Sequence, residues 1–246
     1  MDPMALPVEP PPSARPPGWF ERLSALAEVM LVAFLGSFFA LSIFAILGTS
    51  PMTDASHIVA FMWLEALVTV VLIGGLLRIH RPAVRLGWSR QGGAREAAIG
   101  LGALPLLFLV TIGVGAAFQW LCPPCVTEQN PLLNIVRTGI DLALFLVSSL
   151  FVGGFKEELQ RAFVLTRFRS HLGGVWVGLT VWTVVFGALH SLQGFDKAVA
   201  AGALGLVFGL VYIWRGKLLA PMVAHSLYDV VTLIIFWWTI HTPGRL

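Results

Sequence analysis

Long, uninterrupted apolar runs dominate this sequence and limit the folds that it can adopt. A helix needs about 20 apolar residues to cross the ~30 Å hydrocarbon layer of a bilayer, and seven stretches are long enough. Each run is continuous rather than alternating, which argues against the strands of a membrane β-barrel. We therefore predict an all-α fold, a polytopic transmembrane helix bundle of about seven spans. The expected spans lie near residues 25–48, 58–79, 97–121, 139–163, 174–193, 198–214 and 218–240.

The composition agrees with a protein whose solvent is lipid. Hydrophobic residues make up 57% of the 246 positions and charged residues only 12%, whereas soluble domains are about one quarter charged. The formal net charge of +3 is small, and nothing in it favours nucleic acid as a partner. We expect an integral, multi-pass protein of a bacterial or archaeal cell membrane.

The chain divides into three parts. Residues 1–22 are proline-rich, with no apolar core, and are predicted to form a disordered tail. Residues 23–138 are expected to hold three transmembrane helices and their loops. Residues 139–240 contain the ionisable motifs described below and are expected to form the catalytic helices.

The basic residues predict the orientation. With a cytoplasmic N-terminus, only Arg137, Lys197 and Arg245 of the 16 Lys and Arg fall on the outer side, as the positive-inside rule favours. Cys122 and Cys125, in a Cys-Pro-Pro-Cys segment, then lie in an outward loop. Two cysteines do not complete a structural zinc site, so we expect either a local disulfide or two free thiols.

The fourth apolar run leads into the sequence Glu157-Glu158-Leu159-Gln160-Arg161. Carboxylates beside a membrane span are costly to bury, so they need a partner or a purpose. On a helix, both glutamates can reach Arg161 at spacings of four and three residues. We expect Glu158 to pair with Arg161 and Glu157 to stay free, although the reverse assignment is open. The plainer alternative is a helix end with solvated charges.

Two later runs add further ionisable groups. His190 ends the fifth run, and His225 and Asp229 lie four residues apart, on one face of the seventh. Taken singly, each fits an interfacial histidine or a His–Asp pair that joins helices. Taken jointly, three helices supply the carboxylates and imidazoles that a hydrolase needs. Glu65, in the second run, has no such motif, and we interpret it as structural or pore-lining.

Together, the motifs Glu157-Glu158-x-x-Arg161, Phe186-x-x-x-His190 and His225-x-x-x-Asp229 resemble those of the CPBP family. These are the CAAX-prenyl-protease and bacteriocin-processing membrane proteins, also called type II CAAX or ABI proteases. The resemblance covers roughly residues 139–240 and implies an all-helical intramembrane endopeptidase. Its motif positions map to Glu157, Glu158, Arg161, His190, His225 and Asp229, with Phe186 as a packing element that lines the cavity. Asp229 is a mild departure, since Asn is common at that position.

Peptide hydrolysis requires an activated water and a donor to the developing oxyanion. We expect Glu157, helped by His190, to activate the water, and His225 with Asp229 to stabilise the oxyanion. Asp229 would also hold the tautomer of His225. A metal-free glutamate mechanism without a cofactor is favoured. The alternative is Zn²⁺ held by Glu157, His190, His225 and Asp229.

The expected partners are the lipid bilayer and a membrane-associated protein or peptide substrate. A prenylated CAAX-type tail, a bacteriocin leader and a C-terminal sorting segment all fit. Two other functions stay open at this point. One is a proton-coupled transporter using Glu65, Glu157 and His190, although no internal repeat supports it. The other is a non-catalytic scaffold or immunity protein of the same fold, which would be expected to have a degraded site.

Overall fold

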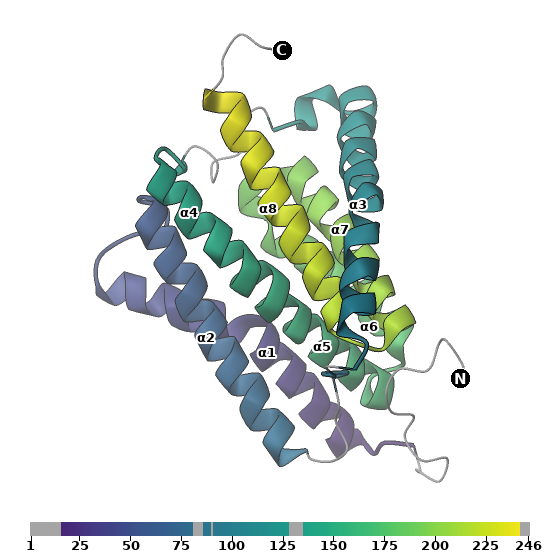
Figure 1. Ribbon diagram of the computed structural model, residues 1–246. Helices are drawn as coiled ribbons and strands as arrows, with labels where there is room; N and C mark the ends of the chain where they lie inside the picture. Colours follow the sequence, from purple (N-terminus) through teal and green to yellow (C-terminus); the bar gives the residue numbers. More distant parts are fainter. Residues whose placement is uncertain (1–15, 81–85, 90, 128–134, 242–246) are drawn as a thin grey trace.

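The computed structural model describes residues 16–80, 86–89, 91–127 and 135–241, and these are helical with no strand among them. Within these ranges, eight α-helices are joined by short loops and three further helical segments (Figure 1). The elements are α1 (Trp19–Ile46), α2 (Ala55–Ile79), α3 (Gly93–Leu121), η1 (Pro123–Cys125), α4 (Gly139–Ser148), η3 (Ser149–Glu157), α5 (Glu158–His171), α6 (Val175–Leu189), η4 (Ser191–Gln193), α7 (Phe195–Arg215) and α8 (Leu219–His241).

Six helices in the described part are long and apolar enough to cross a membrane. The all-helical membrane fold is thereby confirmed, with α4, η3 and α5 joined into one helix, Gly139–His171. This helix is longer than the span predicted at 139–163. The fifth predicted span corresponds to α6, which has only 15 residues. At 1.5 Å per residue it extends roughly 22 Å, which is too short for a complete crossing.

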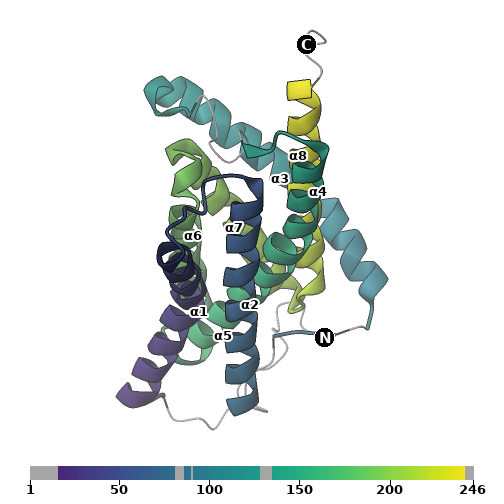
Figure 2. The ribbon, with the colours of Figure 1, turned by 90° about the vertical axis from the view of Figure 1, so that its left-hand side faces the viewer.

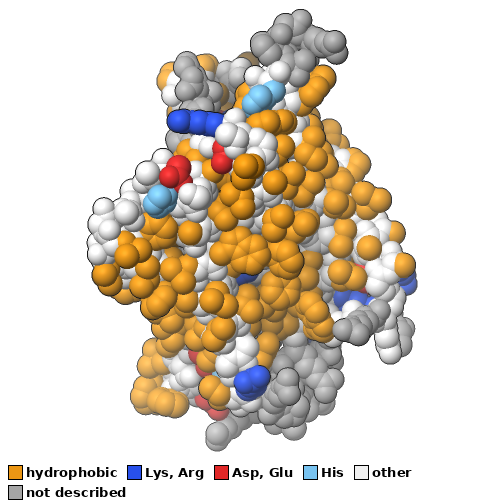
Figure 3. Space-filling view, turned by 60° about the vertical axis from the view of Figure 1, so that its left-hand side comes forward, with side chains coloured by type: hydrophobic (Ala, Val, Ile, Leu, Met, Phe, Trp, Pro, Cys, Tyr) orange, Lys and Arg blue, Asp and Glu red, His pale blue; other side chains and the backbone are white. Residues whose placement is uncertain are grey.

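Apolar side chains cover the middle of the molecule, as a lipid-facing surface requires. Figure 3 shows one face on which hydrophobic groups form a broad zone, with most of the visible charged groups above or below it. In the ribbon, α2, α4 and α8 run roughly along the same direction, while α3 crosses them obliquely (Figure 2). We conclude that the chain is an integral membrane protein.

Helix ends follow ordinary capping rules. Thr138 begins α4 with a capping box, in which its side chain accepts from the Asp141 backbone N–H and its own N–H donates to the Asp141 carboxylate. The side chain of Asp54 likewise accepts from the backbone N–H of His57 at the start of α2. Gly216 ends α7 in the left-handed conformation, with φ 60°, that glycine adopts readily.

The end of the predicted N-terminal tail is helical, and the cysteine loop is closed by a disulfide. Residues 1–15 of the tail lie outside the described residues, whereas Trp19–Arg22 form the first turn of α1. Cys122 and Cys125 form a disulfide around η1. Beyond this loop, Thr127 donates its backbone N–H to Asp196, at the start of α7. The loop therefore packs against the turn between α6 and α7.

Buried polar contacts tie the first two helices to the long central helix. The side-chain amide of Gln160 donates to the backbone carbonyl of Val32 at 2.6 Å, which joins α5 to α1. Arg167 on α5 forms an ion pair with Glu28 on α1 at 2.9 Å, and His80, at the end of α2, contacts the same carboxylate. The N-terminal helices are thus bound to the helix that bears the Glu-Glu-x-x-Arg sequence.

Candidate active site between η3, α5, α6, α7 and α8

A π-helical segment precedes the glutamate pair. Segment η3 spans Ser149–Glu157 within the long central helix, and π-helical turns are rare and frequent at functional sites. Two glycines let α8 approach it closely. A Cβ at Gly153 would overlap the Asp229 carboxylate, and one at Gly154 would overlap the Ser226 hydroxyl. The polar face of α8 is therefore pressed against η3.

Glu158 lies at the centre of the cluster, between Arg161 and His225. Its Oε1 atom contacts the Arg161 guanidinium and also lies 2.7 Å from Nδ1 of His225. The side chains of Glu158 and Arg161 are 1% and 0% exposed, and that of His225 is 7% exposed. A buried carboxylate is stabilised by such cationic and N–H partners. Arg161 and Glu158 thus fix the orientation of the imidazole.

The other imidazole nitrogen faces two carboxylates. Nε2 of His225 lies 3.8 Å from Oε2 of Glu157 and 3.7 Å from Oδ2 of Asp229. These separations are too long for direct hydrogen bonds and suit a bridging water. The Glu157 and Asp229 side chains, at 18% and 29% exposed, are also more open than Glu158. The site can therefore present a water to a carboxylate and an imidazole together.

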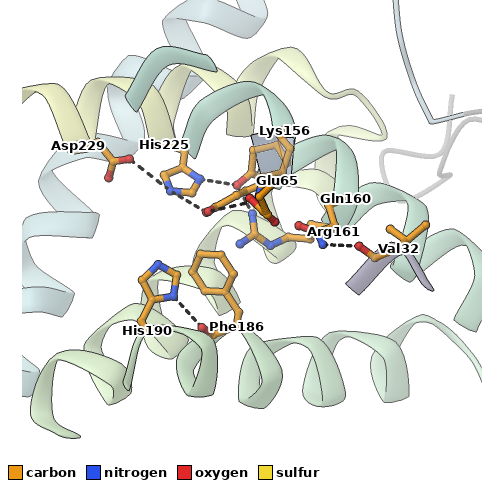
Figure 4. A network of polar contacts seen from close by, with 11 residues as sticks. Val32, Glu65, Lys156, Gln160, Arg161, Phe186, His190, His225 and Asp229 are labelled. Atoms are coloured by element: carbon orange, nitrogen blue, oxygen red, sulfur yellow. Dashed lines mark hydrogen bonds and ion pairs between the residues drawn. The ribbon is translucent and has the colours of Figure 1, made fainter. Parts of the chain in front are cut away.

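His190 and Phe186 reach the site from α6. His190 caps the C-terminus of the helix, and its Nδ1 lies 2.7 Å from the Phe186 carbonyl. A carbonyl only accepts, so Nδ1 carries the hydrogen and Nε2 is the acceptor in the neutral ring. In Figure 4, His190 lies across from His225 and Asp229. The described residues show no hydrogen bond or ion pair between His190 and Glu157.

Aromatic rings enclose the buried charges. Phe208 on α7 stacks on His225, with ring centroids 4.3 Å apart. The guanidinium of Arg161 lies 4.8 Å from the ring centre of Phe186 and 5.4 Å from that of Phe208, which is within range of cation–π attraction. A Cβ at Gly205 would meet the Phe186 ring at 2.9 Å, so this glycine lets α6 pack closely on α7.

A second buried ion pair borders the site on the side of α2. Nζ of Lys156 lies 2.9 and 2.7 Å from the two carboxylate oxygens of Glu65. It also lies 3.8 Å from Oε1 of Glu157. Both members of the pair are almost fully buried, since the side chains of Lys156 and Glu65 are 5% and 11% exposed. Glu65 on the second helix therefore holds the Lys156 ammonium group close to the candidate catalytic glutamate.

The structure brings the sequence-predicted residues into one region. Glu158 pairs with Arg161 as expected, and His225 lies between Glu158, Glu157 and Asp229. One expected detail is different. The group at Nδ1 of His225 is Glu158 rather than Asp229, because α5 presents Glu158 directly to that nitrogen.

Three residues of this region are not among the sequence-predicted site residues: Phe208, Lys156 and Glu65, the last of which is interpreted from the sequence as structural or pore-lining. Phe208 gives no signal, because it is one apolar residue in an apolar helix. Lys156 and Glu65 do give a signal, since a charged residue within a span usually has a partner. The missing information was which two charges meet across helices.

Zinc binding is the alternative that the sequence leaves open for this site. Catalytic zinc usually has three protein ligands. Within the described ranges, no three His, Cys, Asp or Glu side chains converge so as to hold a metal ion. The alternative zinc set of Glu157, His190, His225 and Asp229 stays a prediction, and no step below is assigned to a metal.

The fold and the cluster define an integral membrane protein with a buried ionisable site between its helices. Residues 139–231 match the family model described as type II CAAX prenyl endopeptidase Rce1-like. The match includes every sequence-predicted site position and confirms the resemblance to the CPBP family. Over these residues the chain is similar to a CAAX-type intramembrane protease family. No curated protein and no solved structure matches the chain.

Proposed function

We propose that this protein is an intramembrane endopeptidase that hydrolyses a peptide bond of a membrane-associated protein or peptide. One observation carries the proposal. Nε2 of His225 lies within 4 Å of both the Glu157 and the Asp229 carboxylates, while Nδ1 is held by Glu158. Three polar groups thus lie close enough together to share hydrogen bonds with one water. The Rce1-like match over residues 139–231 supports the same reaction class.

In the proposed first step, Glu157 takes a proton from this water. The water oxygen bonds to the scissile carbonyl carbon, and the carbonyl electron pair moves to oxygen. His225, in its doubly protonated form, donates from Nε2 to this oxyanion while its Nδ1–H donates to Glu158. Asp229, beside the same imidazole nitrogen, orients the water. The proton held by Glu157 then passes to the amide nitrogen as the C–N bond breaks.

His190 contributes from the opposite side in this scheme. Because Nδ1 donates to the Phe186 carbonyl, the neutral ring offers Nε2 as an acceptor. We assign it the role of holding the attacking water or the departing amine by a hydrogen bond. Phe186 and Phe208 line the site and limit the entry of bulk water, which strengthens the electrostatic interactions within it.

The proposed substrate is a peptide segment at the membrane, with a prenylated CAAX-type tail as the first candidate. The matched family model supports this choice. A bacteriocin leader and a C-terminal sorting segment are the other candidates. We also propose a cytoplasmic N-terminus, which the distribution of Lys and Arg supports.

Proteomics of membrane-protein termini tests the proposal and identifies the substrate in the same experiment. Cells that carry the wild-type protein are compared with cells that carry Glu157→Gln, and Glu21→Gln, an exposed carboxylate on α1, is the matched control. We expect cleaved protein termini in cells that carry the wild-type or the Glu21→Gln protein. The same termini should be absent from cells that carry Glu157→Gln. A scaffold or immunity protein would give the same termini in all three.

A further inference from the structure

We infer that Lys156 and Glu65 are positioning residues for Glu157, so that the candidate active site includes a charge anchored on α2. The inference rests on the proposed role of Glu157 as the base. It extends the site beyond the family-matched residues 139–231, because Glu65 lies on the second helix.

The Lys156 ammonium group is held in one position by Glu65. Lys156 reaches both oxygens of Glu65, at 2.9 and 2.7 Å. A lysine side chain is long and flexible, so a single exposed contact would leave its charge mobile. Here the two contacts and the burial of the side chain, 5% exposed, hold the ammonium in one place.

The two carboxylate oxygens of Glu157 face different charged or polar groups. Oε1 lies 3.8 Å from Nζ of Lys156, and Oε2 lies 3.8 Å from Nε2 of His225. Opposite charges attract strongly at this separation where water is scarce. Lys156 therefore draws one oxygen toward α2 and leaves the other facing the proposed water. The Lys156–Glu65 pair thereby sets the rotation of the Glu157 carboxylate.

Helix α2 is tightly packed against α1 at the turn that bears Glu65. A Cβ at Gly36 on α1 would lie 2.6 Å from the Glu65 backbone oxygen and 2.5 Å from the Thr69 hydroxyl. The two helix backbones are thus in close contact at the turn that bears Glu65, as small residues allow in membrane proteins. The carboxylate that anchors Lys156 stands on a tightly packed pair of helices.

The competing interpretation is that Lys156 and Glu65 only hold two helices together. Reversal of the pair separates the two roles. Glu65→Lys/Lys156→Glu keeps an ion pair between α2 and η3, but it places a negative charge beside Glu157. Lys156→Arg keeps the positive charge, and Lys156→Met removes it with little change in length.

The experiment measures the Glu157-dependent termini and the thermal unfolding of each full-length variant in detergent. We expect Lys156→Arg to retain most product and Lys156→Met to lose at least about tenfold, since a 1 Å misplacement of a catalytic group can cost about a hundredfold. The reversed pair should recover the unfolding temperature lost in Lys156→Met, but not the product.

Recovery of both stability and product in the reversed pair overturns the inference, as does a Lys156→Met variant with wild-type product. If the reversed variant does not fold, the comparison of Lys156→Arg with Lys156→Met tests the inference instead. Equal amounts of product per folded molecule from these two variants would overturn the inference. Failure of the proposed function is distinct, because Glu157→Gln would then leave the termini unchanged. That outcome also overturns the positioning role, which presupposes the base.

Discussion

Nδ1 of His225 on α8 lies 2.7 Å from Oε1 of Glu158 on α5, and Arg161 contacts the same carboxylate. An ionised carboxylate only accepts hydrogen bonds, so Nδ1 carries the hydrogen. Nε2 is thereby left to face Glu157 and Asp229. The two adjacent glutamates therefore differ in role: Glu158 is a buried group that positions His225, and Glu157 is the more open candidate base.

The two glutamates should differ in their effect on stability. In Glu158→Gln, Arg161 keeps a fully buried charge without an ionised partner, and loss of one partner of a buried pair costs about 3–5 kcal/mol. Glu157→Gln should change stability far less, because its side chain is 18% exposed. Thermal unfolding of both purified variants in detergent checks this. Equal losses of stability would contradict the assignment.

Gly154 should be needed for the close contact between η3 and α8. A Cβ there would overlap the Ser226 hydroxyl and lie 3.0 Å from the Met222 carbonyl, so Gly154→Ala must push α8 outward. We expect a loss of about 1–3 kcal/mol of stability, together with loss of activity. Gly113→Ala is the control, since nothing lies within 4 Å of its added Cβ. Similar unfolding temperatures for the two variants would refute this packing argument.

Asp229 should tolerate replacement by asparagine better than by alanine. Its Oδ2 lies 3.7 Å from Nε2 of His225, and Asn retains the size and an oxygen that can accept. We expect measurable product from Asp229→Asn and none from Asp229→Ala, in the termini assay with folded protein verified by unfolding. An Asn variant that is folded but inactive would show that the negative charge itself is required.

Chelation should leave activity unchanged. Among the described residues, no group of three His, Cys, Asp or Glu side chains could hold a metal ion, and the proposed steps use only side chains and water. Purified protein incubated with a strong chelator is compared with an untreated sample, by the rate of cleavage of a peptide carrying a prenylated cysteine and three further residues. Activity that disappears with the chelator and returns with zinc would replace the glutamate mechanism by a metal-dependent one.

Much of the fold could be predicted from the sequence because helix spacing and hydropathy act locally. Apolar runs located the helices, and the pairing of Glu158 with Arg161 follows from a spacing of three residues on one helix. The joint pattern of Glu157, His190 and His225 also indicated a hydrolytic site and a family. These inferences did not depend on how the helices pack.

The rest depends on contacts between helices. A local pattern cannot show that Lys156 meets Glu65, 91 positions away, or that Phe208 stacks on His225. The predicted span 174–193 also overestimates α6, because the helix ends at Leu189 and the chain turns at His190 into the short segment η4. The π-helical segment η3 has no spacing signal, since its glycines make sense only once α8 lies against them.

Glu157 is proposed to activate the water that cleaves the peptide bond. The most direct measurement is kcat of purified wild type and Glu157→Gln in lipid nanodiscs, on the peptide that the termini assay identifies. We expect kcat to fall by about 10²–10⁴-fold in Glu157→Gln, the usual contribution of a general base, with the unfolding temperature nearly unchanged. A folded Glu157→Gln protein with kcat within a few-fold of wild type would contradict it.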